Sequence, residues 1–125
     1  MDSLARIAAD IHCCEACELR RTATKPVPGL GEVGAKFYLL GESPGRQEDA
    51  DGIPFVGQAG KKLNKLLTLA GIDLNDCYLG NVCRCRPPDN RTPKKKEIQA
   101  CQGFVFRELR LIRPATIITL GSTPL

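Results

Sequence analysis

The chain of 125 residues lacks the features that direct a protein into or across a membrane. It has no apolar run of about 18 residues or more, so no membrane-spanning helix is predicted. Its first residues, MDSLARIAADIHCC, include acids and an arginine and do not form the basic start and apolar run of a secretory signal. We therefore expect a soluble, cytoplasmic protein.

Strong charge, internal repeats and low-complexity tracts are also missing. The formal net charge of +4 is mildly basic, which permits an anionic partner without requiring one. The chain has about the size of one domain, and 42% of its residues are hydrophobic, enough to bury a core without disulfides. No linker divides it, and we predict a single domain over residues 1–125.

Three apolar segments, 37–40, 77–82 and 115–120, have the composition of buried strands. The first runs into Gly41-Glu42-Ser43-Pro44-Gly45, which indicates a tight loop directly after the strand. Because strands alternate with helices, we expect a parallel sheet whose strands all end at one edge, where α/β proteins place their chemistry. Three strands are few for this architecture, so we expect the chain to be incomplete at its C-terminus.

Helical patterns separate these strands. Ser3 can cap an N-terminal helix that leads into a group of cysteines. An amphipathic helix is predicted from Gln58 to a cap at Gly71, and a single long helix from a cap at Thr92 to Pro114. The other segments are predicted to be loops, chiefly 22–34 and 49–57.

Seven cysteines need an explanation in a reducing compartment, where disulfide frameworks are rare. Cys14 and Cys17 have the two-residue gap with which two sulfurs chelate one centre. A wide, uneven set of four cysteines suits an iron–sulfur cluster better than a zinc knuckle. A zinc-binding structural module and buried free thiols are the alternatives. The candidate partners of the first pair are Cys83, Cys85 and Cys101, with Cys77 as apolar filler in a strand.

Several motifs together resemble one known family. The segments CEACELR, FYLLGESPGRQED, GIPFVGQAGKKLNKLL, YLGNVCRCRPPDNRTP and IITLG occur in this order, with a cysteine before the last. From about Cys14 to Leu120 they resemble the iron–sulfur-containing (family 4) uracil-DNA glycosylases. The resemblance implies a three-layer αβα sandwich with a central parallel sheet, here truncated after the third strand. It also implies a [4Fe-4S] cluster of structural role on Cys14, Cys17, Cys85 and Cys101, with Cys13, Cys77 and Cys83 as non-ligands.

The same resemblance implies a uracil site. Phe55 matches the aromatic residue that stacks on the flipped base, and Asn81 matches the residue whose amide recognises the uracil edge. Glu42 would lie beside the glycosidic bond and orient or activate the attacking water, while backbone N–H groups from Gly41 to Ser43 would face the uracil carbonyl. From the residues alone, Phe55 could be a core residue, Asn81 a turn residue and Glu42 a solvated loop residue.

Further charged residues accompany these motifs. Glu48 and Asp49 match family acids, for which we expect only a loop-ordering role. Basic residues gather around the loop after the second strand, where they form either a solvated face or a phosphate-binding surface. They are Arg84, Arg86, Arg91, Lys94, Lys95 and Lys96, of which Arg86, Arg91, Lys94 and Lys95 are the candidate DNA contacts.

The family's second motif, a histidine followed by proline, is expected beyond Leu125. The only histidine, His12, is expected at the surface or beside the cluster rather than in catalysis. The function implied is that of a monomeric, monofunctional DNA-repair glycosylase, nucleoid-associated in a prokaryote, that removes uracil from single- or double-stranded DNA. The alternative is a catalytically impaired iron–sulfur DNA-binding relative without the histidine motif.

Overall fold

A parallel sheet of three strands forms the centre of the protein in the computed structural model, which describes residues 2–121 and 123–124. The strands are β1 (Phe37–Gly41), β2 (Cys77–Asn81) and β3 (Thr116–Thr119), in the order β2-β1-β3. All run in the same direction, and Gly41 at the end of β1 is paired with Asn81 at the end of β2. The predicted α/β class is confirmed.

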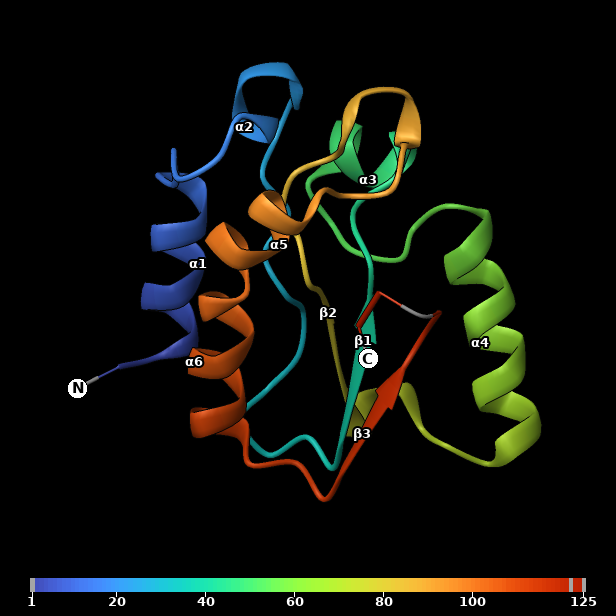
Figure 1. Cartoon of the computed structure of the whole chain (residues 1–125). Helices are drawn as coiled ribbons and strands as arrows, with labels where there is room; N and C mark the ends of the chain where they lie inside the picture. Colours follow the sequence, from blue (N-terminus) through green and yellow to red (C-terminus); the bar gives the residue numbers. More distant parts are fainter. Residues whose placement is uncertain (1, 122, 125) are drawn as a thin grey trace.

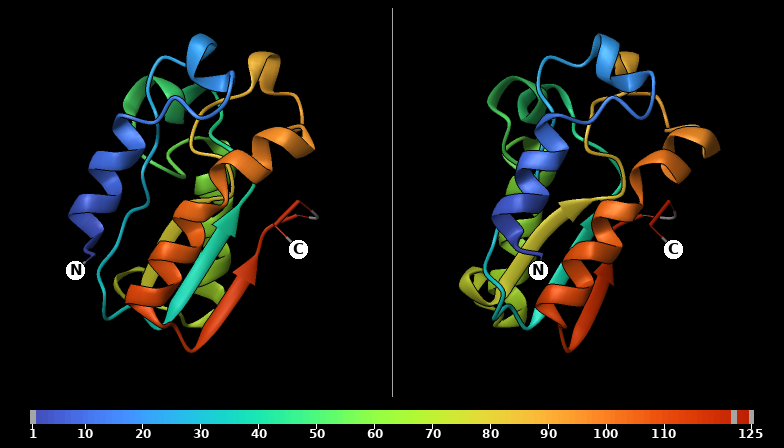
Figure 2. Two further views of the ribbon diagram at one scale, coloured as in Figure 1. Left: turned by 60° about the vertical axis from the view of Figure 1, so that its left-hand side comes forward. Right: turned by 90° about the vertical axis from the view of Figure 1, so that its left-hand side faces the viewer.

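Helices cover both faces of this sheet (Figures 1 and 2). On one face lie α1 (Leu4–His12) and α6 (Gly103–Ile112), and on the other lies α4 (Gln58–Ala70). The alternation of side chains along a strand explains the two cores. Tyr38 and Leu40 pack on the α6 side, whereas Leu39 packs with residues of α4. The arrangement is the predicted three-layer sandwich.

The short helices lie beyond the carboxyl ends of the strands, except for the one that directly precedes β2 (Figure 1). Two of them, α2 and α3, were not predicted from the sequence. No helix within residues 2–121 and 123–124 is long and apolar enough to cross a membrane. The remaining elements are α2 (Leu19–Thr22), α3 (Arg46–Asp51), η1 (Leu74–Asp76), η2 (Pro88–Asn90) and α5 (Lys95–Cys101).

The helix boundaries confirm two predictions and correct others. Ser3 caps α1 by accepting a hydrogen bond from the backbone N–H of Arg6, and Gly71 ends α4 in a left-handed conformation. The single long helix from Thr92 is wrong. The chain instead forms α5 and α6, interrupted at Gln102, and α5 starts only at Lys95 because Glu97 accepts the backbone N–H of Lys94.

Candidate functional site

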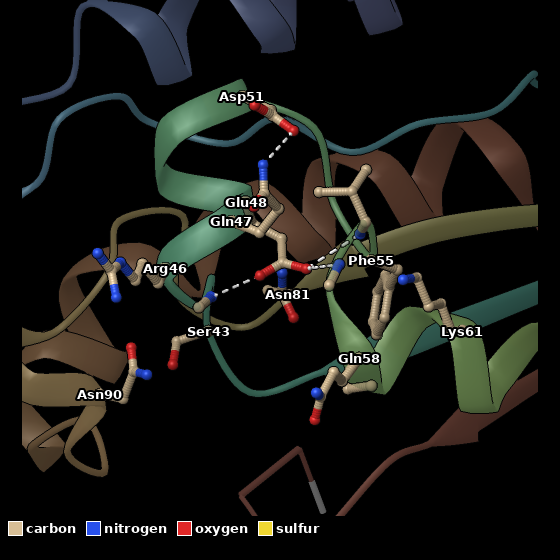
Figure 3. Close-up of a pocket in the computed structure, with 14 residues that line it drawn as sticks. Ser43, Arg46, Gln47, Glu48, Asp51, Phe55, Gln58, Lys61, Asn81 and Asn90 are labelled. Atoms are coloured by element: carbon tan, nitrogen blue, oxygen red, sulfur yellow. Dashed lines mark hydrogen bonds between the residues drawn. The ribbon is translucent and has the colours of Figure 1, made fainter.

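A pocket of about 800 Å³ lies beyond the carboxyl ends of β1 and β2 (Figure 3). Four segments contribute to its wall: the loop after β1 with α3, the loop before α4 with the start of α4, the end of β2, and η2. This is the edge at which open parallel sheets bind ligands. Its polar and aromatic lining residues include Ser43, Arg46, Gln47, Phe55, Gln58, Lys61, Asn81 and Asn90.

Gly41 is the point at which two of the predicted site residues meet. A Cβ atom at this position would lie 2.5 Å from Oδ1 of Asn81 and 2.8 Å from Cζ of Phe55. Contacts this short leave no room for a side chain, so glycine is needed at the end of β1. The structure therefore brings Phe55 and Asn81 together, although they come from segments 26 residues apart.

Phe55 reaches this place through an unusual backbone conformation. Its φ of 57° lies in the left-handed region, which non-glycine residues adopt rarely and often at functional sites. The helix α4 approaches it so closely that a Cβ atom on Gly60 would lie 1.9 Å from the carbonyl oxygen of Phe55. The ring is half-buried, packs on the core beside α4 and also lines the pocket.

Glu48 ties together the two loops that flank the pocket. Its buried carboxylate accepts backbone hydrogen bonds from Gly45 at 3.0 Å, Val56 at 3.0 Å and Gly57 at 2.7 Å (Figure 3). The first of these donors follows β1, and the other two follow Phe55. The loop-ordering role expected for Glu48 is confirmed.

Asp49 orders a different loop. Its Oδ1 accepts the backbone N–H groups of Thr24 at 2.8 Å and Lys25 at 3.3 Å. These residues belong to the long loop between α2 and β1, so Asp49 fastens that loop to α3. The loop-ordering role expected for this acid is confirmed as well.

Glu42 occupies a different position from its neighbour Ser43, which lines the pocket. It is half-buried and is not among the residues that line the pocket. Its Oε2 accepts a hydrogen bond from Oγ1 of Thr123 at 2.5 Å, and its backbone carbonyl accepts the N–H of Cys83 at 3.0 Å. A catalytic role for Glu42 stays a prediction.

Several lining residues were missed by sequence reasoning. Arg46 and Gln47 lie on α3, which fell partly inside a predicted loop. The signal was the spacing of Gly45 and Glu48, since a glutamate at the third helical position commonly accepts the N–H of the capping residue. The other missed residues carried no comparable signal; they include Asp51, Gln58, Lys61 and Asn90.

The basic residues do not form one surface. The prediction that Arg84 belongs to a solvated or phosphate-binding surface is wrong, because Arg84 lies in the core and pairs with Glu108. Arg86 donates from Nε to Oδ1 of Asn90 at 2.7 Å, next to the pocket. Arg91 forms a two-bond pair with Glu97. The run from 94 to 96 is exposed.

The four cysteines expected as ligands line one small cavity: Cys14, Cys17, Cys85 and Cys101. They come from the α1–α2 connection, from the loop after β2 and from the end of α5. Backbone N–H groups already point at two of the sulfurs, since Ala16 donates to Cys14 at 3.5 Å and Arg84 donates to Cys101 at 3.2 Å. Four thiols with such donors fit an iron–sulfur cluster. In the described part of the chain, however, no three His, Cys, Asp or Glu residues are already placed to hold a metal ion.

Burial raises the pKa of two of these thiols. It raises the pKa of Cys17, and it raises the pKa of Cys85 to about 12. In contrast, a hydrogen bond from Cys83 lowers the pKa of Cys101, and the backbone N–H of Arg84 lowers it further. Among the expected non-ligands, Cys13 is exposed, and Cys77 packs in the core beside α4 as the predicted filler. His12 is exposed, as predicted.

Fold and site together define an α/β protein with a polar, aromatic-lined pocket at the carboxyl edge of its sheet and a cysteine-lined cavity nearby. The model of the uracil DNA glycosylase superfamily matches residues 28–125, and the chain belongs to this superfamily. The predicted resemblance to its type-4 branch is confirmed by individual relatives.

Three of these relatives are type-4 uracil-DNA glycosylases. The chain is 45% identical to the protein of Archaeoglobus fulgidus over 97% of this chain and 61% of that protein. It is 43% identical to the protein of Saccharolobus solfataricus over 97% of this chain and 56% of that protein. For Thermotoga maritima the values are 44%, 90% and 58%. The chain therefore spans somewhat more than half the length of these relatives.

Proposed function

We propose that this chain forms the base-recognition part of a DNA-repair glycosylase that hydrolyses the N-glycosidic bond of uracil in DNA. The proposal rests on one observation. Phe55 and Asn81 both lie against Gly41, and both line the pocket of about 800 Å³. An enzyme that excises a base must first take it out of the stack and enclose it. The type-4 relatives are uracil-DNA glycosylases by name, which agrees with this proposal.

Recognition would depend on two side chains. The edge of uracil offers a carbonyl acceptor and an imide donor, which one amide can satisfy with its N–H and its oxygen. Asn81 is 5% exposed, so a base with the opposite pattern, such as cytosine, would leave buried polar groups unpaired. The ring of Phe55 would stack on the base and contribute roughly 1–3 kcal/mol.

Hydrolysis would proceed next to the loop after β1. Glu42 would accept a proton from the attacking water while its other oxygen stays fixed by Thr123. Water oxygen then bonds to C1′ of the sugar, the bond from C1′ to N1 breaks, and its electron pair leaves with the uracil anion. Backbone N–H groups from Gly41 to Ser43 would stabilise that anion at its carbonyl oxygen.

The cysteine cavity would hold a [4Fe-4S] cluster on Cys14, Cys17, Cys85 and Cys101, consistent with its four thiols and its N–H donors. When bound, the cluster would supply a structural crosslink between the end of α1 and the loop after β2. No step of the hydrolysis involves it.

DNA would lie over the face that carries η2 and the start of α5. Lys94 and Lys95 are exposed there, and Arg86 contacts Asn90 of the pocket wall. With Arg91 they would bind phosphates and position the strand without recognising sequence. The proposed protein acts as a monomer on single- or double-stranded DNA, at the nucleoid in a prokaryotic cytoplasm. Residues 1–125 would form one incomplete domain of it.

Uracil release from single- and double-stranded oligonucleotides by the full-length protein tests this proposal. Asn81→Ala should lower kcat/KM at least about 100-fold, because the edge of the base loses its partner. Asn64→Ala, an exposed position on α4, serves as the matched control and should leave the rate unchanged. If Asn81→Ala kept full activity, Asn81 would not be the residue that recognises the uracil edge. Binding of uracil-containing DNA without any base release would instead favour the catalytically impaired relative.

A further inference from the structure

A buried ion pair lies in the core between the sheet and α6. Arg84 is 1% exposed and Glu108 is 0% exposed. Tyr38 donates to Oε1 of Glu108 at 2.5 Å, Tyr78 donates to Oε2 at 2.6 Å, and Nη1 of Arg84 donates to Oε2 at 3.0 Å. Replacing a buried ion pair by apolar residues of similar size is often neutral for stability, so stability alone gives this pair no clear role.

One donor of Arg84 is left over. Among the buried side-chain nitrogen and oxygen atoms of residues 2–121 and 123–124, only its Nε lacks a hydrogen-bond partner. Both terminal nitrogens are used, since Nη1 donates to Glu108 and Nη2 donates to Tyr38 and Glu108. A buried donor without an acceptor is costly, which makes this atom an indicator of a missing acceptor.

The place of Arg84 suggests where that acceptor is. Arg84 lines the cysteine cavity together with the four expected cluster ligands. Its backbone N–H already donates to Sγ of Cys101 at 3.2 Å, and the next residue, Cys85, is one of those ligands. A cage of thiolates and sulfides is rich in acceptors and carries negative charge.

We infer that Arg84 is an outer contact of the iron–sulfur cluster, to which it supplies hydrogen-bond donors and positive charge while Glu108 and two tyrosines fix its guanidinium group. This inference rests on the proposed cluster. Hydrogen bonds to the sulfurs and nearby charge set the potential of such clusters, and outer contacts of this kind also govern how firmly the group is bound.

The reduction potential of the holoprotein, measured by voltammetry, tests the sign of this effect. Arg84→Met removes a positive charge and should lower the potential, whereas Glu108→Gln removes a negative charge and should raise it. Loss of the cluster to an iron chelator should become about tenfold faster in Arg84→Met. Arg107→Met, which breaks an ion pair at the surface of α6, is the control and should change neither value.

A double variant separates this role from simple folding. Arg84→Met with Glu108→Met leaves no unpaired buried charge and should fold even where a single variant fails. It should still lose its cluster faster than the wild type, while Arg84→Lys should restore part of the retention. A double variant with wild-type potential and wild-type cluster retention would overturn the inference. If the wild-type protein contained no iron after anaerobic purification, the proposed cluster itself would be wrong, and the role of Arg84 with it.

Discussion

The pocket beyond β1 and β2 and the cysteine cavity lie at the same edge of the sheet but are built in opposite ways. The loops around the pocket are fixed by the chain itself, because Glu48 accepts three backbone N–H groups from them. The cavity is lined by four thiols and by Arg84, a residue whose Nε has no hydrogen-bond partner within the described residues. The loops of the first are therefore preorganised by the chain itself, whereas the second is completed, on our proposal, by a bound cluster.

A short segment connects the two. After β2, the N–H of Val82 donates to the carbonyl of Gly41 at 2.9 Å, and that of Cys83 donates to the carbonyl of Glu42 at 3.0 Å. The following residues, Arg84 and Cys85, belong to the cavity. These bonds use backbone groups and no cysteine side chain. We therefore expect a substitution in the cavity to disturb the pocket only partly, and a substitution in the pocket to disturb the cavity only partly.

Removal of a cysteine ligand should give the largest effect. Cys101→Ser should abolish the visible absorbance of the cluster and lower Tm by more than about 10 °C, because binding energy at a structural site is folding energy. Cys13→Ser, an exposed neighbour of the ligands, should retain both. Retention of a full iron content by Cys101→Ser would show that the four-ligand assignment is wrong.

The second experiment alters the pocket and leaves the cysteines unchanged. Glu48→Gln turns an amide toward N–H groups that need an acceptor, so Phe55 and the loop after β1 should shift. We expect kcat/KM for uracil release to fall about 100-fold, as misplacements of about 1 Å can do, while the cluster absorbance stays intact.

Glu32→Gln is the matched control, because it makes the same change of carboxylate to amide at an exposed loop position outside the pocket. It should leave the release of uracil unchanged. If Glu48→Gln instead removed the cluster and left the activity, the contrast between the two regions would be wrong.

The sequence predicted the parts of this arrangement that depend on local pattern. The apolar runs predicted the strands. The abrupt change to polar residues after each run predicted the carboxyl edge of the sheet, where Gly41 and Asn81 lie. Spacing could not predict the left-handed backbone of Phe55, whose carbonyl lies against Gly60 of α4. The pattern of apolar and polar residues indicates which side chains are buried, but it carries no information on the φ angle of a single loop residue.

Arg84 shows the converse failure. It was grouped with Arg86 and Arg91 because they are neighbours in sequence, yet its partner lies on α6. One signal was present, because Glu108 falls on the apolar face of that helix, between Val105 and Ile112. A buried carboxylate needs a partner, but pattern alone does not say which arginine provides it.

The smallest effect is expected at Glu97, which orders the loop between the two regions. It accepts bonds from Arg91 at 2.8 and 2.9 Å and from the backbone of Lys94 at 2.7 Å, and the pair with Arg91 lowers the pKa of Glu97 to about 2. Its stabilising contribution is therefore complete above the ordinary pKa of 4.5 and is lost as the pH falls from there toward 2.

Glu97→Gln should lower Tm by about 2–5 °C at pH 7, since Arg91 is partly exposed and such pairs contribute little. The difference from the wild type should shrink in acid and vanish near the lowered pKa, when both chains are followed by circular dichroism. Glu32→Gln, at an exposed loop position, should show no difference at any pH. If the difference in Tm between Glu97→Gln and the wild type stayed constant into strong acid, the charge of Glu97 would not be what stabilises this loop. The loop would then depend on uncharged hydrogen bonds and packing.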